Sequence, residues 1–200
     1  VRRSEYKGKP SLNLDLTTHD FNLDLDHVIF KGFKGKIGAS YVYQENYPNA
    51  GTGVSPLIPY YEKHNWGIYW IENYQVTSNL ILEGGFRYDY QKIDALKFYK
   101  KARWNSLGYD TKYPDLVIRD TGLSYLTNPV LDFNGYAATL GATYKLGTTG
   151  DLIFNYSLSS RAPNPGELFS DGLHHSAAAI ELGDLELKNE KSNKLMATFK

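Results

Sequence analysis

The sequence contains no cysteine, and its positive and negative charges cancel. The absence of Cys from all 200 residues excludes disulfides, a thiol nucleophile and thiolate metal ligands. With 22 Lys and Arg against 22 Asp and Glu, the chain lacks the basic excess by which proteins neutralise nucleic-acid phosphates. No nucleic-acid partner is therefore expected.

Long apolar runs are missing as well. No stretch reaches the roughly 18 consecutive apolar residues that a membrane-spanning helix requires. The opening residues Val1–Ser4 are not followed by the apolar segment of a secretory signal peptide. A chain that starts in this way is expected to be a portion of a longer protein.

Tyrosine and glycine are abundant instead, with 17 Tyr and 18 Gly. From Leu80 to Tyr90 the even positions are apolar or glycine, whereas the odd positions include the charged residues Glu83, Arg87 and Asp89. The same alternation recurs over residues 33–44, 133–146 and 152–159. Successive side chains of a strand point to opposite faces, so each segment predicts a strand with one apolar and one polar face.

The N-terminal segment alternates with a change of phase. Its apolar residues lie at even positions from Leu12 to Leu16 and at odd positions from Phe21 to Leu25. One extra residue in a strand shifts the phase in this way, so the pattern predicts a β-bulge between residues 17 and 20. A tight turn at the same place is the alternative.

The connections between the predicted strands alternate in length. Short turns are expected near Lys31–Gly32, Val76–Asn79 and Gly147–Gly150, and long connections over residues 46–61, 95–131 and 162–186. Short turns at one end and long loops at the other are typical of outer-membrane β-barrels. A soluble β-sandwich with half-buried strands would also alternate and remains the other possibility.

The spacing of aromatic residues can be compared with the thickness of a membrane. Tyr136 and Tyr144 are eight residues apart on one face, which is roughly 26 Å along a strand. A strand tilt of about 40° reduces this to about 20 Å, close to the roughly 25 Å apolar band of outer-membrane barrels. The spacing therefore favours the barrel.

Three segments resemble the TonB-dependent outer-membrane receptors. Residues 84–90 (GGFRYDY) follow the strand 66–74 as in that family's hairpin, and residues 159–169 (SSRAPNPGELF) are similar to its Arg-Ala-Pro…Glu-Leu box. Residues 181–190 (ELGDLELKNE) are similar to its Gly-Asn-x-x-Leu…Glu box, with Asp184 where Asn is usual and Asn189 where Pro is common.

The resemblance implies an all-β fold, namely a portion of an antiparallel up-and-down transmembrane β-barrel. About seven or eight of the family's 22 strands are expected, with short periplasmic turns and long extracellular loops. Residues 1–200 would belong to one barrel domain, without the family's plug domain and last strand. The residues of the family motifs and of the lumen network are Arg87, Asp89, Arg161, Pro163, Glu167, Leu168 and Glu190. The lumen charges should face opposite charges on neighbouring strands.

No catalytic motif is present in the sequence. Gly-x-Ser-x-Gly, His-Glu-x-x-His and a phosphate-binding glycine loop are all missing, so neither an enzyme nor a bound cofactor is expected. Asn22, Asp24 and Asp26 resemble the start of a calcium loop but lack its Gly and distal Glu, so no metal site is expected and a lumen-facing strand fits better.

Candidate ligand contacts lie in the long loops. His174 and His175 stand between the two family boxes, where haem-uptake members of the family place a haem-contacting His, and imidazole is a good iron ligand. A polar loop without a ligand is the alternative. The loop aromatic residues that could contact a ligand, or pack on one another instead, are Tyr60, Tyr61, Trp104, Tyr109, Tyr113 and Tyr125.

The predicted function is active transport across a Gram-negative outer membrane. The resemblance implies an embedded receptor surrounded by outer-membrane lipid. It would bind a ferric siderophore, haem, cobalamin or an oligosaccharide and be gated by the TonB energising complex through the plug. A soluble β-sandwich that binds carbohydrate is the main alternative. An outer-membrane enzyme or a passive porin is the third class, which the missing catalytic motifs and the Arg-Ala-Pro box disfavour.

Overall fold

The computed structural model describes residues 5–6, 9–10, 13–49, 51, 55–174 and 178–200. The long strands are β3 (Leu14–Phe30), β4 (Phe33–Pro48), β5 (Tyr60–Gln75), β6 (Leu80–Lys100), β9 (Val130–Lys145), β10 (Asp151–Arg161) and β13 (Glu190–Phe199). The shorter strands are β1 (Glu5–Tyr6), β2 (Lys9–Pro10), β7 (Val117–Asp120), β8 (Ser124–Thr127), β11 (Asp171–His174) and β12 (Ala179–Leu182). The helices are α1 (Lys101–Ser106), α2 (Tyr109–Lys112), the 3-10 helix η2 (Pro114–Leu116) and α3 (Pro165–Phe169).

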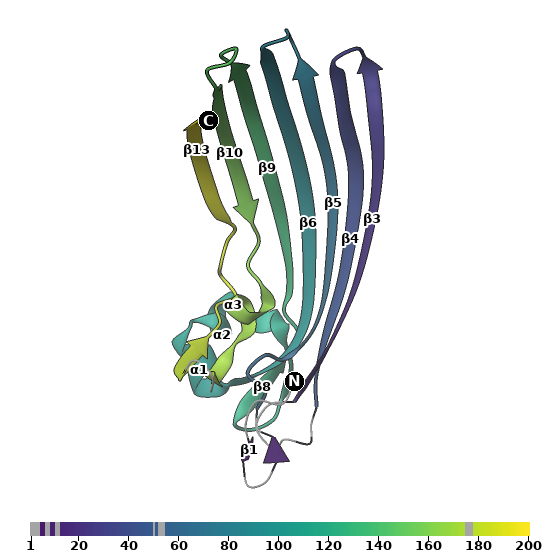
Figure 1. The fold of residues 1–200 in the computed structure, drawn as a ribbon. Helices are drawn as coiled ribbons and strands as arrows, with labels where there is room; N and C mark the ends of the chain where they lie inside the picture. The colour runs from purple at the N-terminus through teal and green to yellow at the C-terminus, as the bar shows by residue number, and fades with distance from the viewer. Residues whose placement is uncertain (1–4, 7–8, 11–12, 50, 52–54, 175–177) are drawn as a thin grey trace.

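Seven long strands form one curved sheet (Figure 1). Their order in the sheet is β13-β10-β9-β6-β5-β4-β3, which follows the chain, and every neighbouring pair is antiparallel. Short turns join the strands at one end and long connections join them at the other, as the sequence predicts. The expected antiparallel up-and-down portion of a barrel is confirmed, and a sandwich of two packed sheets is not what the chain forms.

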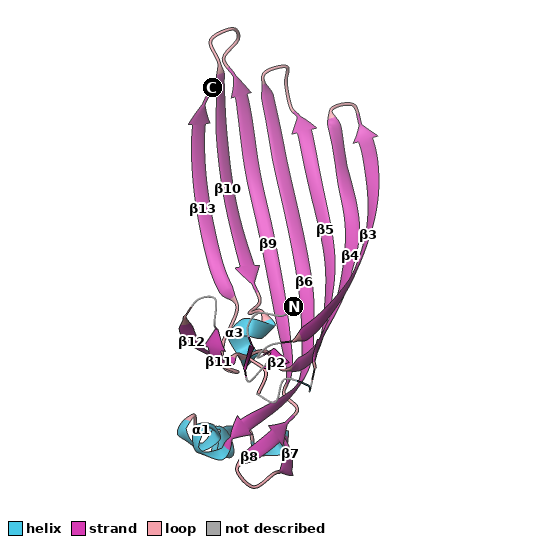
Figure 2. Cartoon of the chain, turned by 60° about the horizontal axis from the view of Figure 1, so that its bottom comes forward, coloured by secondary structure: helices cyan, strands magenta, loops and turns pink. Residues whose placement is uncertain are grey.

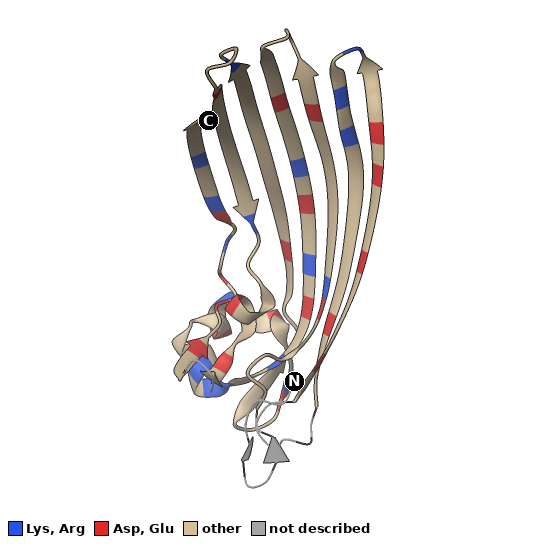
Figure 3. Cartoon of the chain, viewed as in Figure 1, with Lys and Arg blue, Asp and Glu red and all other residues tan. Residues whose placement is uncertain are grey.

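The register gives the sheet two different faces. On one face, Leu25 lies opposite Ile37, Ile37 opposite Trp70 and Trp70 opposite Phe86, and all four side chains are exposed or partly exposed. We call this the apolar face. The other face carries most of the polar residues, among them Asp24, Lys36 and Arg87. Figure 3 shows charges of both signs along β3–β6.

The polar face is the concave one. A single hollow of about 610 Å³ is lined from the six strands β3, β4, β5, β6, β9 and β10, by residues that include Asp24, Lys36, Tyr69, Arg87 and Ser159. Asp24 contacts Lys36 and the Tyr69 hydroxyl on this face, as expected for lumen-facing residues. No described helix is long and apolar enough to cross a membrane.

The predicted β-bulge between residues 17 and 20 is wrong. β3 pairs with β4 without interruption from Leu14 to Val28, and the one irregularity lies between Val28 and Phe30, beside the turn. The phase of the apolar residues changes because the apolar face of β3 ends between residues 17 and 20. From there to the start of β3, the positions on the apolar face carry polar residues. Leu14 and Leu16 lie on the polar face.

A packed core lies among the long loops at one end of the sheet. β6 continues to Lys100, into the connection predicted to begin at residue 95, and pairs with β8 there. Helices α1 and α3 and the hairpins β7–β8 and β11–β12 gather at this end (Figure 2). The buried side chains of this core are Tyr61, Ile93, Ala95, Tyr99, Trp104, Tyr109, Phe133, Leu168, Phe169 and Leu185. We call them the loop core.

Candidate functional site

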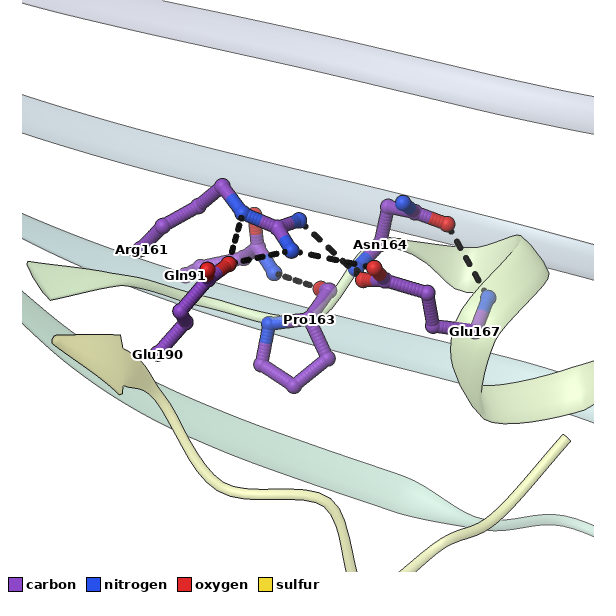
Figure 4. A network of polar contacts seen from close by, with 6 residues as sticks. All are labelled: Gln91, Arg161, Pro163, Asn164, Glu167 and Glu190. Carbon is purple, nitrogen blue, oxygen red and sulfur yellow. Dashed lines mark hydrogen bonds and ion pairs between the residues drawn. The ribbon is translucent and has the colours of Figure 1, made fainter. Parts of the chain in front are cut away.

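Arg161 is the centre of a polar junction between the sheet and a long loop (Figure 4). Its Nη1 and Nη2 donate to the two carboxylate oxygens of Glu167 at 3.1 and 3.0 Å. Its Nε and Nη2 donate to Oε2 of Glu190 at 3.2 and 2.9 Å. One guanidinium therefore joins the end of β10, the helix α3 and the start of β13.

The sequence around Arg161 builds this junction locally. Asn164 accepts from the Glu167 backbone N–H at 3.0 Å, and the Glu167 carboxylate accepts from the Asn164 backbone N–H at 2.8 Å, which makes a capping box. Pro165 occupies the first turn of α3, where a missing N–H costs nothing. The Arg161 guanidinium and the Asn164 N–H together hold the pKa of the Glu167 carboxyl below its ordinary value.

Contacts with β6 and with the loop core also hold this junction in place. Gln91 on β6 donates from its side-chain amide to the Pro163 carbonyl at 3.1 Å. Leu168 is fully buried in the loop core, and Gly183 passes directly against its backbone. A Cβ at Gly183 would lie 2.5 Å from the Leu168 carbonyl oxygen, so glycine is required for this approach.

A polar hollow of about 330 Å³ separates Arg161 from a second ion pair. There Arg87 donates to both carboxylate oxygens of Asp89, at 2.8 and 2.6 Å, and to Ser40 at 2.9 Å. The expectation that these charges face opposite charges on neighbouring strands is wrong. Gly67 lies opposite Asp89 and leaves the space in which Arg87 and Asp89 pair along their own strand.

Lys97 belongs to this end of the molecule, although the sequence analysis did not select it. It is 3% exposed, its Nζ donates to the Phe169 carbonyl at 2.7 Å, and it lies 4.3 Å from the centre of the Tyr99 ring. Burial lowers the pKa of Lys97 to about 8. The signal that could have found it is its odd position on β6, in phase with the buried residues Ile93 and Ala95.

The predicted loop aromatic residues all lie at this end, and most of them pack on one another. Trp104 and Tyr109 are buried, with their ring centres 5.2 Å apart, and Tyr61 is also buried in the loop core. Tyr113 and Tyr125 pack against the same core. Tyr60 is partly exposed and donates to Glu62. Contact of these residues with a ligand stays a prediction.

The two predicted histidines are only partly described. His174 lies in the β11–β12 hairpin with its Nδ1 2.6 Å from Oε1 of Glu181, and His175 lies outside the described residues. In the described part of the chain, no three His, Asp or Glu side chains are grouped so that they could hold a metal ion. Haem contact by either histidine stays a prediction.

Comparisons with known proteins place this geometry in context. A family model described as TonB-dependent receptor-like β-barrel matches residues 2–200. The rhizobactin receptor of Rhizobium meliloti (strain 1021) is 24% identical over 128 residues, which is 60% of this chain and 16% of that protein.

Among solved structures, one match is a double mutant of the Serratia marcescens hemophore receptor HasR in complex with its hemophore HasA and heme. It has a TM-score of 0.63 and 20% identity, and the match covers 92% of this chain and 29% of that chain. At this identity the likeness concerns the fold. The chain thus spans less than a third of the length of either protein.

Proposed function

We propose, because this chain belongs to the family of TonB-dependent receptor β-barrels, that it is the barrel portion of an outer-membrane receptor for a scarce, large ligand. A ferric siderophore is the leading ligand class, since the relative that is similar in sequence is named for rhizobactin. Entry of the ligand would be gated through a plug domain by the TonB energising complex. Both named relatives are receptors, and we propose no catalytic activity.

The apolar face supports a membrane location. Trp66 packs between Tyr41 and Tyr90, with ring centres 5.4 and 5.7 Å away, and Phe33 packs on Tyr74 at the turn end. Trp66 and Tyr74 are eight residues apart on β5, which is roughly 26 Å along the strand, or about 20 Å for a tilt of about 40°. Two aromatic rows at this separation fit the borders of an outer membrane.

The observation that carries the proposal is the junction at Arg161. A passive pore needs an open polar lumen. Here, in contrast, a guanidinium with four hydrogen bonds fixes α3 and the start of β13 to the end of β10, at the loop end of the polar concave face. Loops that are held in one arrangement can present a ligand surface, and the polar face below them offers a path lined by groups such as Arg87. The carbohydrate-binding sandwich is not favoured by the family match or by the single sheet.

The test uses the full-length receptor in its own bacterium. We would delete the gene and measure uptake of iron-55 supplied as ferric rhizobactin, as haem or as ferric citrate under iron limitation, with labelled cobalamin as a further probe. Loss of uptake of one probe, restored by the intact gene, is the expected result. Unchanged uptake of every probe would refute the iron-receptor assignment. A protein found in the soluble fraction would refute the membrane location.

A further inference from the structure

Tyr109 joins two long connections that are far apart in the sequence. Its hydroxyl donates to Oδ1 of Asp184 at 2.8 Å and accepts from the Leu185 backbone N–H at 3.1 Å. The ring is 1% exposed and packs on Trp104 and Tyr113, with ring centres 5.2 and 5.3 Å apart. One buried oxygen therefore connects the segment after β6 with the segment before β13.

Further contacts follow the same seam. Lys112, three residues after Tyr109, lies 2.5 Å from the Glu186 carboxylate. Leu185 is buried in the loop core. Asp184 in turn donates its backbone N–H to the Glu167 carbonyl at 3.1 Å. The segment 183–187 is thus held by α2 on one side and by α3 on the other.

The chemistry of the Tyr109 hydroxyl suits this position. Burial and the neighbouring Asp184 carboxylate raise the pKa of Tyr109, so the phenol keeps its proton and remains a donor. A phenol that donates once and accepts once serves the half-buried Asp184 carboxylate and the buried Leu185 N–H together. Phenylalanine would preserve the ring packing and leave the Leu185 N–H without its acceptor.

We propose that Tyr109 is a positioning residue that locks residues 101–127 and 183–187 into one rigid body. These two connections then open and close together and not as independent loops. Lys97, through the Phe169 carbonyl, fastens the same body to β6. The consequence for transport, that a ligand which displaces one connection must also move the other, rests on the proposed function. The proposal that the two connections form one rigid body does not rest on it.

The first test is hydrogen exchange of the full-length receptor in detergent, without any ligand. Tyr109→Phe should raise exchange about tenfold to a hundredfold in both residues 109–113 and residues 185–187, since the link to Asp184 is lost and the buried Leu185 N–H is left without its acceptor. Tyr113→Phe is the matched control, because its ring is in the same stack and no hydrogen bond of its hydroxyl is recorded among the described residues. It should leave both segments unchanged. A rise in one segment alone, or in neither, would overturn the proposal.

A second pair of variants covers the case in which Tyr109→Phe loosens the whole barrel. Asp184→Asn keeps an acceptor oxygen and should retain slow exchange in both segments. Asp184→Ala also removes the acceptor of the Glu186 N–H, so its informative effect is the release of residues 109–113. Equal exchange in these two variants would overturn the proposal. The folded barrel is checked by its different migration before and after boiling. Since no ligand is used, the outcome does not depend on whether the transport assignment is right.

Discussion

Arg161 and Glu167 form a two-point ion pair in which each guanidinium Nη contacts one carboxylate oxygen, at 3.1 and 3.0 Å. The same carboxylate closes the capping box with Asn164. One glutamate therefore serves as the ion-pair partner of the strand end and as the third residue of α3 that completes the capping box with the N-cap Asn164. Its removal should affect both the strand end and the helix start.

Glu167→Ala should destabilise the connection of residues 162–189 by about 1–2 kcal/mol. Loss of the cap accounts for about 1 kcal/mol, and the exposed ion pair adds less than that. Glu167→Gln keeps a capping acceptor and should recover most of the loss. Hydrogen exchange over residues 162–189 of the full-length receptor measures the effect. Equal exchange in Glu167→Ala and wild type would show that the cap is not what holds the loop.

The junction should be insensitive to pH near neutrality and loosen in acid. The pKa of Glu167 is lowered from its ordinary value of 4.5, mainly by the hydrogen bonds from Arg161 and then by the Asn164 N–H. A carboxylate with a lowered pKa contributes stability above its unfolded value and loses it as the pH falls through its folded value. The rate of proteolysis within residues 162–189, measured at pH 7, 5 and 3, should increase only at the lowest pH. Glu167→Gln should lack that acceleration.

Lys97→Met should remove an alkaline rise in stability. The pKa of Lys97 falls from 10.5 to about 8 because of burial, so the unfolded chain binds more protons than the folded one between these values. Wild-type stability should therefore rise from about pH 8 to 10.5, by at most about 3 kcal/mol. The methionine variant is measured over the same range by thermal loss of the folded barrel. The same rise in both proteins would assign it to another group.

Gly183→Ala should detach the segment 183–187 from α3. The added Cβ would lie 2.5 Å from the carbonyl carbon and oxygen of Leu168, which are backbone atoms that cannot turn away. Gly51→Ala is the matched control, since no atom of the described residues lies within 4 Å of a Cβ there. Limited proteolysis should cut the Gly183 variant faster after residue 182 and leave the Gly51 variant at the wild-type rate. Equal rates in the two variants would disprove the close approach.

His27→Ala should destabilise the barrel in lipid. His27 and Glu72 are the ionisable side chains between the two aromatic rows on the apolar face of β3–β6, with Nε2 and Oε1 2.7 Å apart. The Trp70 indole N–H also donates to Glu72, at 2.5 Å. Loss of the imidazole leaves the buried carboxylate short of a partner, at a cost of about 1–3 kcal/mol. Thermal loss of the folded band in vesicles tests this, and adding Glu72→Gln should restore most of the stability.

The regular parts of the fold could be predicted because they follow local rules. Strand periodicity identified the two faces of β6, and the turn at Lys31–Gly32 joins β3 and β4 as expected, with Gly32 at a φ of 86° that favours glycine. The bulge prediction failed because a change of apolar phase can mark the edge of an apolar surface as well as an extra residue. The expectation of a loop from residue 95 onward is wrong for the last residues of β6, because β8 supplies partners that local sequence does not reveal.

The sequence by itself determined the strands, the order of short turns and long connections, and the family boxes that include Arg161 and Glu167. These features depend on neighbours a few residues apart. Only the tertiary structure decided that Tyr109 meets Asp184, 75 residues away, and that Lys97 is buried against Phe169. Such contacts arise when separate loops pack into one core, and side chains that meet in this way share no spacing that a single sequence could show.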